Sequence, residues 1–412
     1  MNQHTWKNIA NTYGTPAYIY DGNKIAEQYE LLKNCLPEPF EIFYSVKSNP
    51  LLGICELLKK LGSCIEVASS GELYMALQAG FHPSQIIFTS PGKTYTDLLY
   101  AIETGIYSIN VESLEEAKLI HQIASGRRRK VNISLRINPN FNINGAGMKM
   151  TGVPTQFGID QSFLKETMEI IQALPFVRIH GIHIFSGSQM LNANHIVLTV
   201  EEIMKLTVDL MDTYHFELDF LDLGGGFGIP YFKGESYLET EQLQSGLAEL
   251  WGRYKKRLAG VRIGVESGRF LLAEAGSFMT RVLYVKESKG SKYLVCDGGS
   301  NQHASTAFLG RYVRNNFPMR LLGKDGDLEE LNVVGSLCTP TDVLGQKVML
   351  PNAEPGDLLI IDKSGAYGLT HSPVLFLSHV LPPEIICLDG EIRVLRERGH
   401  YADFLRGQHS FC

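Results

Sequence analysis

The chain has 412 residues, of which 44% are hydrophobic and 20% charged, a composition typical of a globular protein with a large core. A net charge of −6 gives no support for binding to nucleic acid or to an anionic membrane surface. The seven cysteines include no Cys-x-x-Cys pair, so we expect a cytoplasmic protein with neither a disulfide framework nor a metal site. The N-terminus lacks an apolar signal region, and no apolar run reaches the length of a membrane span.

Strands and helices are predicted to alternate from residue 22 to residue 270. The expected strands are 43–47, 63–68, 85–89, 107–111, 132–138, 179–185, 218–223 and 262–266. The expected helices between them are 51–61, 71–79, 94–104, 114–124, 163–174, 196–214 and 243–257. Eight such repeats over roughly 250 residues predict a TIM-like α/β barrel, and an open doubly wound sheet is the alternative.

The pattern changes after residue 270, where few helices separate the strands. The strands expected there are 291–297, 330–334, 357–362, 374–379 and 391–396. A strand over residues 16–20 is assigned to the same region because no helical pattern includes it. We therefore expect a β-rich second domain made of residues 1–21 and 271–412.

A lysine ends the first predicted barrel strand, in the stretch Phe-Tyr-Ser-Val-Lys-Ser-Asn-Pro at residues 43–50. With no charge beside it in the sequence, Lys47 is expected to be poorly hydrated, which favours the neutral, nucleophilic amine. Such an amine can form a Schiff base with an aldehyde such as pyridoxal phosphate (PLP). The alternative is a lysine that simply reaches solvent.

Other chemically capable side chains are predicted at the same mouth, because the carboxyl ends of parallel barrel strands share one face. Glu266 could hydrogen-bond a protonated pyridine nitrogen, and a surface salt bridge is the alternative. Phe185 lies two residues after His183, so both face one side of the strand, and its ring could stack on a flat cofactor or pack in the core. Glu66 and Arg136 are also expected at this mouth.

Two glycine-containing loops follow the seventh and eighth strands, Gly224-Gly225-Gly226 and Gly268-Arg269. Consecutive glycines let several backbone N–H groups approach an anion, and barrels often hold phosphate between these two loops. We therefore predict a phosphate site there. In the second domain, Cys338 with Asp342, and Tyr367 between two glycines, are further candidates, although each motif alone is more often a turn.

Together these motifs resemble the fold-type III PLP-dependent decarboxylases, the family of diaminopimelate, ornithine and arginine decarboxylases. The resemblance runs from Thr15 to Tyr367. Its most specific parts are residues 44–49, 223–227, 266–269 and 365–368, and Cys338 with Asp342. It implies the alanine racemase-like fold, a barrel with a β-rich domain.

The resemblance also implies roles for individual residues. Lys47 would hold PLP covalently and Glu266 would bind its ring nitrogen. The rest of the cofactor site would comprise Glu66, Arg136, His183, Phe185, Ser188, Gly225, Gly226, Gly268, Arg269 and Tyr367. Cys338 would deliver a proton to the substrate from the partner subunit of a homodimer, with Thr339 and Asp342 contacting substrate from the same loop.

Three positions depart from the better-known members of this family. Phe185 stands where they have a stacking histidine, and Ser267 where they have a proline. Thr339 replaces the acid that recognises the distal amine of the substrate, which disfavours lysine, ornithine or diaminopimelate as substrate. The set of residues 183–189 with Cys338-Thr339-Pro340 is more similar to a branch that decarboxylates glutamyl groups tethered to an acyl carrier protein.

The expected reaction is therefore PLP-dependent α-decarboxylation of an L- or D-amino acid, free or tethered to a carrier protein. An amino-acid racemase, a decarboxylase of free diamino acids and a non-catalytic PLP carrier are the alternatives. Glu266 argues against the racemase, which commonly places an arginine at the ring nitrogen. The candidate groups in the β-rich domain argue against the carrier.

Overall fold

The computed structural model describes residues 1–141, 148–149, 152–307 and 315–411, which fold into two compact units. One unit comprises Gln28–Ile229 and Ser236–Phe270, and the other comprises Met1–Glu27, Pro230–Glu235 and Leu271–Cys412. Within the described residues, no helix combines the length and the hydrophobicity needed to cross a bilayer.

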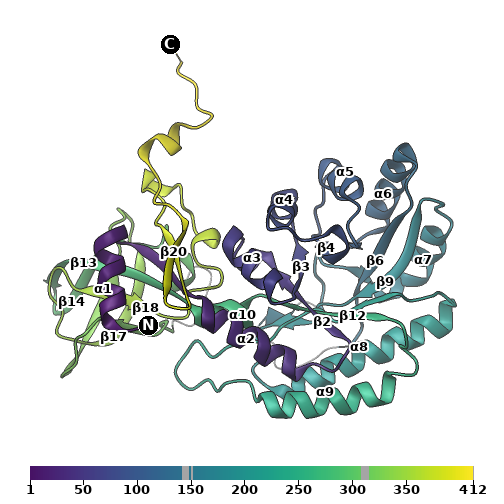
Figure 1. Cartoon of the computed structure of the whole chain (residues 1–412), viewed down its shortest axis with the longest axis horizontal. Coiled ribbons are helices and arrows are strands. Elements are labelled where there is room, and N and C mark those ends of the chain that lie inside the picture. Colours follow the sequence, from purple (N-terminus) through teal and green to yellow (C-terminus); the bar gives the residue numbers. More distant parts are fainter. Residues whose placement is uncertain (142–147, 150–151, 308–314, 412) are drawn as a thin grey trace. The chain divides into compact units, whose positions relative to one another are not determined.

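Eight parallel strands surrounded by helices form a closed barrel in the first unit (Figure 1). The pairing of β5 with β6 closes it. The strands are β2 (Phe40–Ser45), β3 (Cys64–Val67), β4 (Ile86–Thr89), β5 (Ser108–Val111), β6 (Val131–Asn138), β9 (Val177–His183), β11 (Phe220–Asp222) and β12 (Arg262–Ser267). The helices between them are α3 (Leu52–Lys60), α4 (Ser70–Gln78), α5 (Tyr95–Thr104), α6 (Leu114–Arg127), α7 (Leu164–Gln172), α8 (Ala193–Tyr214) and α9 (Thr240–Tyr254). The predicted barrel is thus confirmed, and each strand and helix predicted for residues 22–270 overlaps an observed one.

Several barrel helices begin at a side chain that caps the first turn. Ser69, Thr94, Ser113 and Asn192 each accept a hydrogen bond from the backbone N–H three residues later, at the starts of α4, α5, α6 and α8. Such caps satisfy one of the unpaired amides at a helix start. Because each cap follows a short loop from a strand, the caps fix where the loops at the barrel mouth end.

Aromatic and small side chains fill one level of the barrel interior. Phe43, Cys64, Ile87 and Phe220 form a buried cluster there. A Cβ on Gly264 would lie 2.8 Å from the ring of Phe43, so the glycine makes room for the two aromatic rings. This packed level closes the barrel below the mouth, as expected for a barrel of eight strands.

The second unit contains a mixed sheet with the strand order β17-β16-β14-β13-β1-β19-β20, in which β18 also pairs with β13 and β15 pairs with β18. Its strands are β1 (Ala17–Asp21), β13 (Gly276–Ser288), β14 (Ser291–Cys296), β15 (Met319–Leu321), β16 (Leu328–Val334), β17 (Val343–Pro351), β18 (Leu358–Ile361), β19 (Glu384–Leu388) and β20 (Glu391–Arg396). Helix α1 (Gln3–Tyr13) packs Trp6 and Ile9 onto this sheet. The prediction that a strand near residues 16–20 joins the β-rich region is confirmed, because β1 pairs with β13 and β19.

The remaining α-helices and strands are α2 (Gly22–Cys35), α10 (Arg269–Leu272), β7 (Met148–Lys149), β8 (Ile159–Asp160) and β10 (Gly187–Ser188). The strand expected at 374–379 is wrong: a single 3-10 turn covers Phe376–Ser378, and Leu377 and Ser378 have positive φ. This backbone cannot form an extended ladder, whatever the apolar pattern of its side chains. Strands β13, β15, β17 and β19 were not predicted.

Candidate active site

Polar side chains occupy the next interior level of the barrel, two residues further toward the carboxyl ends of the strands. Inward-facing positions alternate along a strand, so each packed residue is followed by one at the mouth. The members of this level are Ser45, Glu66, Thr89, Asn110, Arg136, His183, Asp222 and Glu266. The sequence thus places its polar interior residues together at the end of the barrel where loops are free to build a site.

Lys47 lies in a 3-10 turn, Val46–Ser48, directly after β2 rather than at the end of the strand. The turn is closed by the hydrogen bond from the Asn49 amide to the Val46 carbonyl oxygen, 2.9 Å long. The expectation of a poorly hydrated amine is wrong, because the Lys47 side chain is 38% exposed. A charge distant in sequence also approaches it, since its Nζ lies 3.2 Å from Oε2 of buried Glu66. Nζ also lies 5.4 Å from the centre of the Phe185 ring, so three predicted site residues meet.

Phe185 itself lies beyond the end of β9, which stops at His183. One ladder-like hydrogen bond continues past the strand, from the Ile184 amide to the Asp222 carbonyl oxygen, 3.1 Å long. The chain then turns through the short strand β10, which contains Ser188 and pairs with β7. The predicted strand was therefore too long by two residues, and Phe185 reaches Lys47 from a loop.

Three fully buried ionisable side chains meet at the ends of β9, β11 and β12. His183 Nε2 lies 3.4 Å from Glu266 Oε1 and 4.0 Å from Asp222 Oδ2. Burial, followed by the carboxylates of Glu66 and Asp222, raises the pKa of Glu266, and burial lowers the pKa of His183. Among the described residues, neither oxygen of Glu266 has a hydrogen-bond partner, which leaves a buried acceptor available for a donor from a ligand.

Arg136 is fixed from two sides at the same level of the barrel. Its Nη1 lies 2.8 Å from Oε1 of Glu112, and its guanidinium lies 4.7 Å from the centre of the Phe157 ring. The second oxygen of Glu112 accepts a hydrogen bond from the Gly158 amide. Glu112 therefore neutralises Arg136 and ties it to the loop that contains Phe157.

The glycines of the predicted phosphate loops are packed against backbone and have no room for a side chain. A Cβ on Gly224 would lie 2.5 Å from the Ile184 carbonyl oxygen, and one on Gly225 would overlap the carbonyl oxygen of Glu266. Gly224 and Gly226 also have φ of +63° and +112°, which favour glycine. A Cβ on Gly268 would lie 2.6 Å from the hydroxyl of Ser48, next to Lys47. Both loops therefore lie against the residues of the mouth.

The remaining predicted residues are placed as follows. Arg269 starts α10, directly after Gly268. Tyr367 has a φ of +55°, and its carbonyl oxygen accepts a hydrogen bond from the Ser305 hydroxyl in the second unit. Cys338 is an exposed free thiol in the loop between β16 and β17 of the same unit.

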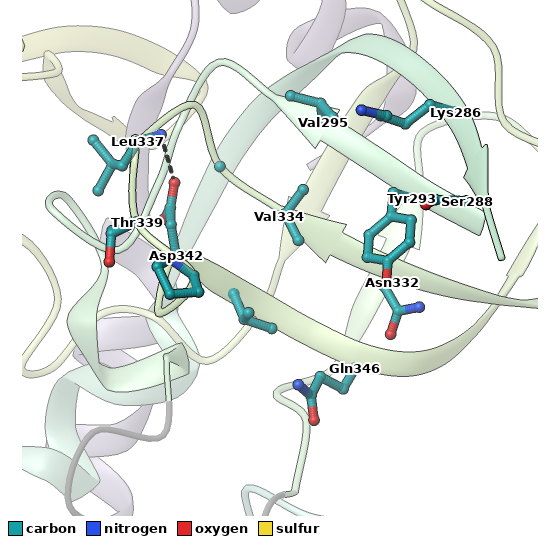
Figure 2. A pocket seen from close by; sticks show the side chains of 13 residues that line it. Lys286, Ser288, Tyr293, Val295, Asn332, Val334, Leu337, Thr339, Asp342 and Gln346 are labelled. Atoms are coloured by element: carbon teal, nitrogen blue, oxygen red, sulfur yellow. Dashed lines mark hydrogen bonds between the residues drawn. The ribbon is translucent and has the colours of Figure 1, made fainter. Parts of the chain in front are cut away.

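Asp342 organises the loop that carries Cys338 and Thr339. Its Oδ1 accepts a hydrogen bond from the Ser300 amide, 2.7 Å. Its Oδ2 accepts one from the Leu337 amide, 2.8 Å, which Figure 2 shows. Beside this loop lies a cavity of about 500 Å³ that strands β13, β14, β16 and β17 line (Figure 2). None of the residues that line this cavity belongs to the set at the barrel mouth that includes Lys47, Glu66 and Glu266. We therefore assign the chemistry to the barrel mouth.

Sequence reasoning missed Asp222, Glu112 and Asn110. Asn110 and Asp222 are the penultimate residues of predicted barrel strands and Glu112 directly follows one, and that position was the available signal. Asn110 donates hydrogen bonds to Thr89, 2.9 Å, and to Asp222, 3.4 Å, which joins three strands across the mouth. A search of every strand end for polar residues would have found all three.

The family model for the pyridoxal-dependent decarboxylase, pyridoxal binding domain, matches residues 22–273, more than half of the chain. The chain belongs to the pyridoxal-dependent decarboxylases. It is 38% identical over 410 residues to the L-glutamyl-[BtrI acyl-carrier protein] decarboxylase of Niallia circulans, covering 97% of this chain and 95% of that one. It is 32% identical over 413 residues to the diaminopimelate decarboxylase of Methanothermobacter thermautotrophicus, covering 97% and 93%.

Solved structures agree with this assignment. Diaminopimelate decarboxylase from Helicobacter pylori, complexed with L-lysine, matches with a TM-score of 0.88 and 29% identity over 97% of this chain and 98% of that one. The enzyme from M. jannaschii matches with a TM-score of 0.90 and 27% identity over 98% and 94%. The predicted alanine racemase-like architecture, the PLP cofactor and the decarboxylase activity are therefore confirmed.

The residues at the mouth fit PLP. The mouth supplies an amine, a ring that can cover a flat cofactor, two glycine loops, and a buried carboxylate that has no hydrogen-bond partner in the part of the chain that the structure describes. An aldehyde, a pyridine and a phosphate require these groups. The carboxylate of Glu266 lies on β12, and the amine of Lys47 follows β2, which pairs with β12. This chain is a PLP-dependent amino-acid decarboxylase.

Proposed function

We propose that this chain decarboxylates a glutamyl group tethered to an acyl carrier protein. The observation that carries the proposal is the chemistry of the Cys338 loop. Thr339 offers only a hydroxyl, which lies 2.9 Å from the hydroxyl of Thr341, and Asp342 uses both carboxylate oxygens on backbone amides. Residues 335–342 therefore present no carboxylate to the distal ammonium of a free diamino acid. The 38% identity to the L-glutamyl-[BtrI acyl-carrier protein] decarboxylase supports the same substrate class.

We assign the following roles to residues of the barrel, residues 22–270. PLP, when bound, takes up the electron pair released when the bond between Cα and the carboxylate breaks. Lys47 supplies the amine that joins the cofactor, and Phe185 covers one face of the ring. Glu266 holds a proton on the ring nitrogen, which strengthens the pull on that electron pair.

The phosphate of PLP is assigned to the glycine loops. Gly225, Gly226 and Gly268, with Ser188 and Arg269, would donate hydrogen bonds to its oxygens, because backbone amides beside glycines approach an anion closely.

We further propose that the enzyme is a cytoplasmic homodimer in which Cys338 of one subunit completes the site of the other. Its thiol would return a proton to Cα after carbon dioxide leaves. Cys338 is exposed and free, as a proton donor to another subunit must be. A reduced thiol in this role suits a reducing compartment.

A test of the substrate class measures release of labelled carbon dioxide from the α-carboxylate. The substrates compared are L-glutamyl carrier protein, free L-glutamate and diaminopimelate, and the Lys47→Ala variant is the blank. We expect release from the tethered substrate alone. Faster release from diaminopimelate would contradict the proposal, and enantiomer exchange without release of carbon dioxide would indicate a racemase.

A further inference from the structure

Two buried acids and one histidine share a small volume at the base of the mouth. One polar atom from each of His183, Asp222 and Glu266 lies within 4.8 Å of the other two, and the three residues are at most 2% exposed. Two carboxylates this close, away from water, cannot both carry a charge unless a cation compensates one of them.

The cations that face this group already have partners of their own. Each lies close to a carboxylate outside the group, in the pairs Lys47–Glu66 at 3.2 Å, Arg136–Glu112 at 2.8 Å and Lys93–Glu116 at 2.6 Å. Burial keeps the His183 ring neutral by lowering its pKa. The group is therefore expected to retain one proton, which balances the second carboxylate.

We propose that Asp222 is a positioning residue that stays ionised and keeps this proton on Glu266, which therefore faces the ring nitrogen of PLP with a proton to hold there. Asp222 Oδ1 accepts a hydrogen bond from the Gly224 amide, 2.9 Å, and Oδ2 accepts one from Asn110, 3.4 Å. The first contact also fixes the start of the glycine loop that we assign to the phosphate. One side chain thereby sets both the charge at the pyridine end and the backbone at the phosphate end.

The direction of the pKa shifts agrees with this assignment. Burial raises the pKa of both carboxyl groups, but the hydrogen bonds from the Gly224 amide and Asn110 oppose the rise at Asp222, whereas the carboxylates of Glu66 and Asp222 add to it at Glu266. A carboxyl group whose pKa rises on folding binds its proton more tightly in the folded chain. Stability therefore falls as the pH rises through the interval between the unfolded and the folded pKa.

The decisive experiment is thermal unfolding of the cofactor-free full-length chain between pH 4 and pH 8, which does not depend on the proposed substrate. Asp222→Asn retains an oxygen for the Gly224 amide and removes one acid. The Tm of Asp222→Asn minus the Tm of the wild type should increase from pH 4 to pH 8, by roughly 2–4 °C in total. Glu266→Gln should show the same gain, because removing either acid relieves the pair, and it carries the test if Asp222→Asn does not fold.

Asp219→Asn is the matched control, because Asp219 lies three residues earlier on the surface and pairs with Arg178 at 2.7 Å. Its unfolding profile should follow that of the wild type at every pH. A constant difference between wild type and both acid variants from pH 4 to pH 8 would overturn the proposal.

A second readout rests on the proposed cofactor site. Asp222→Ala removes the acceptor of the Gly224 amide as well as the acid, so its affinity for PLP, followed by absorbance, should fall at least tenfold below that of Asp222→Asn. Equal affinities would refute the positioning role while leaving the proposed substrate untouched.

Discussion

The Nζ atom of Lys47 lies 3.2 Å from Oε2 of Glu66, a carboxylate that is 1% exposed on the neighbouring strand β3. Parallel pairing places Ser45 of β2 opposite Glu66, and the turn after β2 returns the lysine over the same carboxylate. Glu66 thus holds the amine at the mouth of the barrel, where part of the lysine side chain remains open to solvent.

Lys47→Ala should abolish covalent attachment of PLP, because the remaining side chain has no amine that can condense with an aldehyde. Borohydride reduction followed by mass spectrometry of the peptide that contains residue 47 measures this directly. Lys47→Arg keeps the positive charge beside Glu66 and should also remain unlabelled. Labelling of another lysine in the wild-type chain would contradict our assignment.

Glu266→Gln should still bind PLP but lower kcat on the order of 100-fold, because a neutral amide holds a proton on the ring nitrogen less well than a carboxylate. Steady-state kinetics with the tethered substrate, beside the absorbance of the bound cofactor, separates the two effects. A variant with wild-type kcat would show that this carboxylate does not serve the ring nitrogen.

Gly225→Ala should destabilise the chain by about 1–3 kcal/mol, because the new Cβ would overlap the carbonyl oxygen of Glu266. Affinity for PLP should fall with it, because the loop and Glu266 would move apart. Gly252→Ala in α9 is the matched control, since open space surrounds that glycine, and it should stabilise by about 0.5–1 kcal/mol. Denaturant unfolding of both variants is the measurement, and equal effects would count against our packing argument.

Glu72→Gln should stabilise the chain above neutral pH. Burial raises the pKa of Glu72 to about 7 from an ordinary value of 4.5, although its contact with the Ala68 amide opposes the shift. Ionising this carboxyl therefore costs stability as the pH rises from 4.5 to about 7, and the cost is constant above that. The variant and the wild type should have similar Tm values near pH 4 and differ most at pH 8. A larger difference in Tm between variant and wild type at pH 4 than at pH 8 would disprove this account.

Coexpression of Lys47→Ala with Cys338→Ala tests whether subunits share their sites. If Cys338 serves the partner, a mixed dimer has one intact site of two, so a random mixture should regain about a quarter of wild-type activity. Each variant alone, and the double variant, should be inactive. A mixture as inactive as its components would place both residues in the site of one subunit.

The sequence predicted the barrel well because each of its strands is a short apolar run between two helices. It failed where function depends on contacts distant in sequence. The Lys47–Glu66 pair joins residues 19 positions apart, and the Asn110–Asp222 contact joins residues 112 positions apart, so both require the register of the closed barrel. Apolar residues at 374–379 suggested a strand, but Leu375 is 77% exposed and the backbone turns there.

The glycine loops and Glu266 could be anticipated because their position after the last two strands has a physical reason. The place of Lys47 in a turn could not, since the deciding hydrogen bonds involve Asn49 and Ser48 after the strand. Asp342 was expected to contact substrate from its place near Cys338, and only the structure shows that two backbone amides occupy its oxygens.

The position of β1 has a consequence for synthesis on the ribosome. This strand is made first, yet it lies between β13 and β19, and its Tyr18 pairs with Glu384. At usual translation rates β19 is synthesised roughly 20 to 70 seconds after β1. The barrel can therefore assemble while the nascent chain is still growing, whereas the β-rich unit must await the synthesis of β19, with an apolar strand exposed to chaperones in the meantime.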